Sequence, residues 1–120
     1  MAANRDAVPE MIAGAPPYVR FPPIFIPIIQ GDQVTRQIGV TLMLELVKGQ
    51  EKQPIEEKRL QLNDAFVRDL YVFFQERAGV KSNDIDEMYL KDRLLKIADA
   101  VIGEKVVREV LIEQFFEQRK

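Results

Sequence analysis

Carboxylates, lysines and tyrosines are the side chains on which any chemistry of this chain would have to depend. The 120 residues contain no His and no Cys, and they include a single serine, Ser82, and two threonines, Thr35 and Thr41. A Ser-His-Asp triad, a cysteine nucleophile, an ordinary structural zinc site and a disulfide framework are therefore excluded within the chain. A nucleophile would have to be a carboxylate, a lysine or one of the three tyrosines.

The acidic run from residue 82 to 87 has some of the oxygen ligands of a calcium loop. An EF-hand counted from Asp84 needs a glycine at its sixth position, where this chain has Tyr89. The same residues are typical of a capped helix start, with Asp84 followed by Glu87 three positions later. We therefore expect a helix here and no metal site.

Two further acids, Asp64 and Asp69, fall in a segment with helical periodicity. Five residues of separation turn them to different sides of a helix, so they cannot converge as a catalytic pair. Asp64 stands four residues before Arg68, the favourable order for an exposed ion pair. The six glycines, at positions 14, 31, 39, 49, 79 and 103, never reach the spacing of a phosphate-binding loop. We expect no catalytic residue, no metal and no cofactor.

The composition also limits the classes of function that remain. The formal net charge is −2, with 47% hydrophobic and 30% charged residues, the balance of one folded domain. Basic and acidic residues alternate, which argues against a nucleic-acid partner. No run of about 18 apolar residues would span a membrane, and the first twenty residues lack the pattern of a signal peptide.

The first third of the chain predicts a leader and two strands. Residues 1–17 are rich in Ala, Pro and Gly and predict a flexible leader or tether, with a single domain over 18–120. Residues 18–29 are aromatic and β-branched but contain three prolines, which predicts an edge strand. Residues 30–33 predict a hairpin turn. The alternation over 34–46 predicts a long strand with one buried face, interrupted in pattern by Arg36 and with Gly39 marking a bulge, a bend or a close backbone approach.

The rest predicts two helices and a final strand. Pro54 opens a helix that runs to about Arg77, and a second helix begins after residues 82–84 and ends at Gly103. The apolar run over 105–118 predicts a strand buried on both faces and central in the sheet. The order favours an α+β domain, with a small three-stranded, mostly antiparallel sheet and two helices packed on one face.

One surface is predicted to meet a partner or another copy of the chain. Adjacent residues of a strand point to opposite faces, so Phe115 and Phe116 cannot both enter a core that is covered on one side. An edge strand interrupted by prolines offers a second contact. We place the oligomer or partner surface at Ile26, Ile28, Arg36, Phe115 and Phe116.

Four stretches resemble the periplasmic domain of the FliL family of flagellar basal-body-associated proteins. They are the entry Tyr18–Pro23, the long strand Ile38–Glu45, the helical stretch Leu62–Phe66 and the closing strand Val106–Gln118. The likeness covers about residues 18–118. Family members usually carry a basic residue where this chain has Asn63, and they have an N-terminal membrane helix that is not in this sequence. The chain therefore resembles a divergent or accessory member.

The resemblance implies a stomatin-like fold and a non-enzymatic role in motility. The domain would lie on the periplasmic side of the bacterial inner membrane, at the flagellar basal body, attached through a helix outside this sequence. Its partners would be the flagellar stator proteins and other copies of itself in a ring. Two other classes stay open from the residues alone: a soluble adaptor or small-ligand-binding module unrelated to motility, and, third, an enzyme that uses carboxylates or tyrosines.

Overall fold

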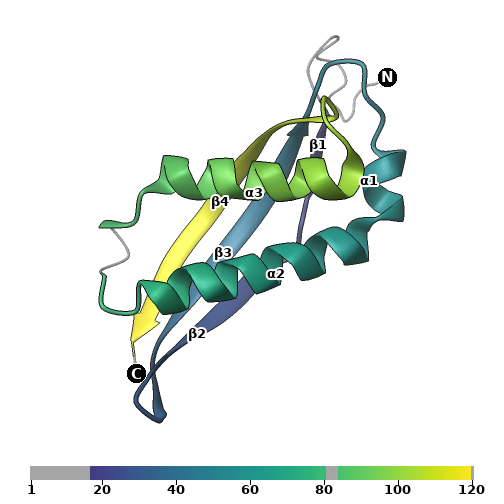
Figure 1. Ribbon diagram of the computed structural model, residues 1–120. Coiled ribbons are helices and arrows are strands. Elements are labelled where there is room, and N and C mark those ends of the chain that lie inside the picture. Colours follow the sequence, from purple (N-terminus) through teal and green to yellow (C-terminus); the bar gives the residue numbers. More distant parts are fainter. Residues whose placement is uncertain (1–16, 81–83, 120) are drawn as a thin grey trace, which may run out of the picture.

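The computed structural model describes residues 17–80 and 84–119 and has an α+β fold, with an antiparallel sheet covered by helices on one face (Figure 1). The α+β class predicted from the sequence is confirmed. The elements in chain order are β1 (Tyr18–Arg20), β2 (Ile24–Gln30), β3 (Gln33–Leu46), α1 (Gln53–Glu57), α2 (Arg59–Glu76), α3 (Glu87–Ile102) and β4 (Val107–Arg119).

The long strand β3 is the centre of the sheet. β1 and β2 each pair with β3, one after the other along the same edge, and β4 pairs with the opposite edge. All three pairings are antiparallel. The sheet therefore has four strands rather than the predicted three. Pro22 and Pro23 cause the difference, because neither can donate a backbone hydrogen bond, and they divide the predicted edge strand in two.

The predicted central position of the last strand is wrong, because β4 lies at an edge and β3 takes the centre. An apolar run predicts burial on both faces, but the outer face of β4 is open. Leu111 is only half-buried there and Phe116 is 45% exposed, whereas Ile112 packs against the core. Apolar residues on an uncovered face thus gave β4 the appearance of a central strand.

The helical boundaries differ from the predicted ones in two places. The single helix predicted from Pro54 to Arg77 is divided at Lys58 into α1 and α2. The second helix begins later than expected: Asp86 is its N-cap and accepts a hydrogen bond from the Tyr89 backbone N–H at 3.1 Å. Residues 82 and 83 of the predicted cap lie outside the described residues, as do residues 1–16 of the leader predicted over 1–17. Gly103 ends α3 at a φ of 120°, as predicted.

One core fills the space between helices and sheet. The apolar, even-numbered side chains of β3 were predicted to be buried, and those from Ile38 to Leu46 are. Only Val34 of this set, beside the hairpin, is exposed. The side chains that face β3 from the helices are also buried. Together they are Ile38, Val40, Leu42, Leu44, Leu46, Ile55, Leu62, Phe66, Leu70, Phe73, Leu90, Leu94 and Ala98.

Three of the residues assigned to a partner surface belong to this interior. Ile26 is 1% exposed and Ile28 is 0% exposed, and Arg36 is 6% exposed. Their assignment to a partner surface is therefore wrong. Ile26 and Ile28 alternate with outward residues along β2, so an edge strand does not expose the side chains that point under the helices.

Arg36 is buried because it holds the segment after α2 against the sheet. Its Nη2 donates to the Ala78 carbonyl oxygen at 2.6 Å and its Nη1 donates to the Val80 carbonyl oxygen at 2.9 Å. The Glu117 carboxylate on β4 lies 3.5 Å from Nη1. One guanidinium thus connects the central strand, the C-terminal side of α2 and the last strand. These acceptors explain how a charged side chain can occupy a buried position of β3 that faces the helices.

We expect Arg36→Met to lower the free energy of unfolding by about 3 kcal/mol, because it removes one partner of a buried ion pair and leaves two carbonyls without a donor. Urea denaturation followed by circular dichroism measures the change. Arg68→Met is the control, since Arg68 pairs with Asp64 on the surface with 78% of its side chain exposed. A surface pair is worth about 1 kcal/mol or less. Equal losses in the two variants would contradict the role assigned to Arg36.

Candidate functional site

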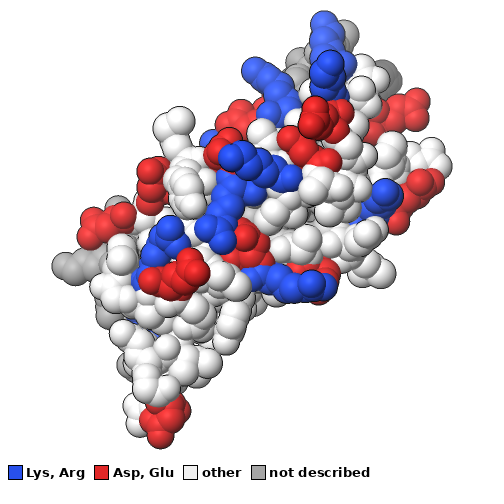
Figure 2. Space-filling view, viewed as in Figure 1, with Lys and Arg blue, Asp and Glu red and all other residues white. Residues whose placement is uncertain are grey.

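Two features on the outer face of the sheet could bind a ligand or a protein partner. The face that carries the helices shows basic and acidic side chains interspersed, without a basic stripe (Figure 2). None of the described helices lies over the outer face (Figure 1). It presents a pair of exposed aromatic rings and, nearer the end where β1 lies, a polar depression.

The aromatic pair consists of Phe25 and Phe116, which lie on either side of Gly39. All three are cross-strand neighbours, since Gly39 pairs with Phe25 of β2 and with Phe116 of β4. The two rings contact edge to face with their centroids 6.1 Å apart, and the side chains are 53% and 45% exposed. This aromatic pair is large enough to anchor a protein contact.

Gly39 is required for that arrangement. A Cβ atom at this position would lie 2.2 Å from Cζ of Phe116, so any other residue would displace the ring. Of the three predicted roles of Gly39, close approach is the one that the structure has. Here the approaching group is the far end of a side-chain ring, not another backbone, and it occupies the space that a Cβ atom of residue 39 would need.

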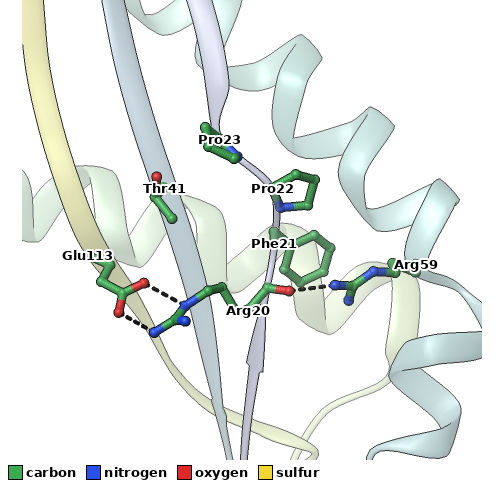
Figure 3. A pocket seen from close by; sticks show the side chains of 7 residues that line it. All are labelled: Arg20, Phe21, Pro22, Pro23, Thr41, Arg59 and Glu113. Carbon is green, nitrogen blue, oxygen red and sulfur yellow. Dashed lines mark hydrogen bonds and ion pairs between the residues drawn. The ribbon is translucent and has the colours of Figure 1, made fainter.

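The depression lies where the chain passes from β1 to β2 (Figure 3). Arg20 and Glu113 point toward each other across β3 and form a bidentate ion pair, with Nε–Oε1 at 2.8 Å and Nη2–Oε2 at 2.5 Å. Thr41 is only 7% exposed, and its Oγ1 has no hydrogen-bond partner among the described residues. Pro22 and Pro23 complete the wall.

Arg59 of α2 borders the depression from the other side of β1 (Figure 3). Its Nη2 donates to the Arg20 carbonyl oxygen at 2.5 Å, and its guanidinium carbon lies 4.8 Å from the centre of the Phe21 ring. Its Nη1 is 3.5 Å from a carboxylate oxygen of Glu56. Two guanidinium groups and one hydroxyl could hold a small anion or a carboxylate, although each cation already has an acidic neighbour.

The two resolved pKa shifts lie away from both features. Burial, together with the nearby Glu104 carboxylate, raises the pKa of Asp99 near the end of α3. The hydrogen bond that Arg93 on α3 donates to Asp69 on α2 raises the pKa of Arg93, and burial opposes this shift. These two ionisable groups sit on the helical layer, where Arg93 and Asp69 join α2 to α3 at 2.8 Å.

The structure separates the predicted site residues. Phe116 is at the surface, as expected, while the side chain of Phe115 lies outside the described residues. Phe25 was not among the predicted contact residues, although its place in the alternation, opposite to that of Ile24 and Ile26, was a usable signal. The Arg20–Glu113 pair was also missed, and sequence holds no signal for it, since the two residues are 93 positions apart.

No protein-family model matches the chain, and no curated protein matches it either. Among residues 17–80 and 84–119, no group of three or more His, Cys, Asp or Glu side chains is arranged to hold a metal ion. The helices of this part of the chain are all too short or too polar to cross a bilayer.

We expect Phe116→Asp to weaken self-association while the helical circular-dichroism signal stays unchanged, because it places a charge on an exposed apolar patch and leaves the core intact. Sedimentation velocity over a range of protein concentrations measures the effect. Tyr71→Asp is the control, since Tyr71 is similarly exposed, at 41%, but lies on α2. Unfolding of Phe116→Asp, or equal weakening by both variants, would contradict the assignment.

Proposed function

We propose that this protein is a non-enzymatic structural or accessory component of the bacterial flagellar motor, a divergent relative of the FliL family. In this proposal the domain lies on the periplasmic side of the inner membrane at the basal body. It packs side by side with other copies, in the manner of stomatin-like domains, and braces or regulates the stator units. Its partners are the stator proteins and further copies of itself.

The observation that carries the proposal is the exposed aromatic pair over Gly39 on the open face of the sheet. The ring of Phe116 approaches the β3 backbone so closely that only glycine fits beneath it. An apolar feature built into the central strand in this way supports a role in protein contact. The α+β order of strands and helices is also compatible with the resemblance seen along the sequence.

The mechanism would be mechanical. A folded domain with a buried core between sheet and helices can carry load, and repeated contacts between copies close into a ring when the rotation between neighbours permits. Such a ring would hold stator units in place through protein contacts and would need no bound cofactor.

Motor output under load tests this proposal. In a strain from which the gene has been cleanly deleted, we expect swimming speed to fall at high viscosity and motor torque to fall under load, because fewer stator units stay anchored. The wild-type gene should restore both. Complementation with Phe116→Asp should restore less than complementation with Tyr71→Asp. Normal motility of the deletion strain at every load would rule out the motor role.

The depression beside Arg20 favours a second candidate, a small-ligand-binding module unrelated to motility. Its chemistry fits a carboxylate or phosphate, so inorganic phosphate and succinate are suitable probes. A saturable rise in melting temperature that Arg59→Gln abolishes would support this function. No rise at millimolar concentrations of either probe would argue against anion binding at the depression.

A further inference from the structure

The depression between β1 and β2 contains a buried hydroxyl group that makes no hydrogen bond. Thr41 is one of the odd-numbered residues of β3, which point to the outer face, and yet it is only 7% exposed. Its Oγ1 is buried and has no hydrogen-bond partner among the described residues. Burying a hydroxyl without a hydrogen bond is unfavourable. A polar atom of a ligand in the depression would supply the missing bond.

The Arg20–Glu113 ion pair spans β3 close to this hydroxyl (Figure 3). The side chain of Arg20 is 64% exposed and that of Glu113 is 33% exposed, so both ends of the pair can reach water. A surface ion pair contributes little to stability, so it can open and close at little cost. Opening would give a ligand access to the guanidinium of Arg20 and to the hydroxyl of Thr41.

Arg59 brings a second donor without a hydrogen bond to the same depression. Its Nη1 is buried and has no hydrogen-bond partner among the described residues, and the nearest acid, Glu56, lies 3.5 Å away. The rest of this guanidinium is held by the Arg20 carbonyl oxygen and by the ring of Phe21. The guanidinium groups of Arg20 and Arg59 lie on opposite sides of the β1 backbone (Figure 3). The depression therefore has a cation on each side.

The chemistry and size of the depression favour a small molecule with two carboxylates. Arg20 already holds a carboxylate, that of Glu113, through two parallel hydrogen bonds, which is the geometry that suits this planar group. The volume of the depression is about 680 Å³. Sites for small molecules measure roughly 300 to 1,000 Å³. One carboxylate can lie on each of the two guanidinium groups.

We propose that the depression binds a small dicarboxylate by exchange with Glu113. One ligand carboxylate replaces that of Glu113 on Arg20 and accepts a hydrogen bond from the hydroxyl of Thr41, and the other accepts from Nη1 of Arg59. Glu113 is an internal competitor that occupies Arg20 while the ligand is absent. This inference rests on the second candidate function above, for which it names the ligand class and the residue that sets the affinity. It does not depend on the motor role.

Substitutions at the two ends of the ion pair test the exchange, with succinate titrated by calorimetry at constant ionic strength. We expect Glu113→Gln to lower the succinate dissociation constant about threefold, because a neutral amide competes poorly for the guanidinium. Arg20→Gln should raise the constant about tenfold, the value of one charge-assisted hydrogen bond. Thr41→Val, which keeps the shape, should also raise it. Circular dichroism verifies that each variant is folded.

A matched control separates this site from general attraction of anions to a freed arginine. Asp64→Asn frees Arg68 from an exposed ion pair on α2, as Glu113→Gln frees Arg20, and it should leave the succinate dissociation constant unchanged. Acetate, with one carboxylate, should bind more weakly than succinate. Arg59→Gln should remove that difference by weakening succinate alone.

The outcomes separate the exchange from the functions proposed above. Weaker binding in both Arg20→Gln and Glu113→Gln, or an equal gain in Asp64→Asn, overturns the exchange. So do binding by Glu113→Gln but not by the wild-type protein, and equal affinities for acetate and succinate. No binding by any form overturns the small-ligand candidate as well. The predicted pattern in a protein whose deletion leaves motility normal would retain the site and reject the motor role, and loss of motility without succinate binding would do the reverse.

Discussion

The pairing of β3 on both of its edges is the constraint on which the rest of the structure depends. A strand that is paired along both of its edges has only its two faces left, and one of them is covered by helices. Its buried parity then determines where α2 and α3 can pack. Arg36, the one charged residue in that parity, completes the arrangement by binding the carbonyls that follow α2. The last strand pairs with β3 directly, the segment after α2 is bound to it through Arg36, and both helices share one buried core with its inward side chains.

The two edges of the sheet differ in how far they are protected, and the difference has a physical cause. The β1–β2 edge carries prolines and receives hydrogen bonds from α2, whereas β4 pairs with β3 alone in the described part of the sheet. Edges that expose unpaired backbone groups invite pairing with another chain, and proteins usually protect them.

The outer face combines two kinds of surface that serve different partners. The Phe25–Phe116 pair over Gly39 is apolar and suited to a protein contact, whereas the depression beside Arg20 is polar and could hold a small anion. The first is built into the central strand by a glycine that cannot be replaced without moving a ring. The second depends on an ion pair with an exposed arginine, which contributes little to stability. This difference is why we base the proposed function on the aromatic pair.

Sequence alone determined the α+β class, the hairpin at Gly31, the buried parity of β3 and the end of α3 at Gly103. These features follow from local periodicity and from backbone conformations that few residues adopt, so they can be read along the chain. The order of strands, the division of the edge strand and the burial of Arg36 were decided by the tertiary structure. An apolar run indicates that a segment is partly buried, but it does not show which neighbouring element buries it. β4 therefore looked central, and Ile26 and Ile28 looked available to a partner. The Arg20–Glu113 pair and the unequal edges likewise exist only after residues far apart in sequence are brought together by folding.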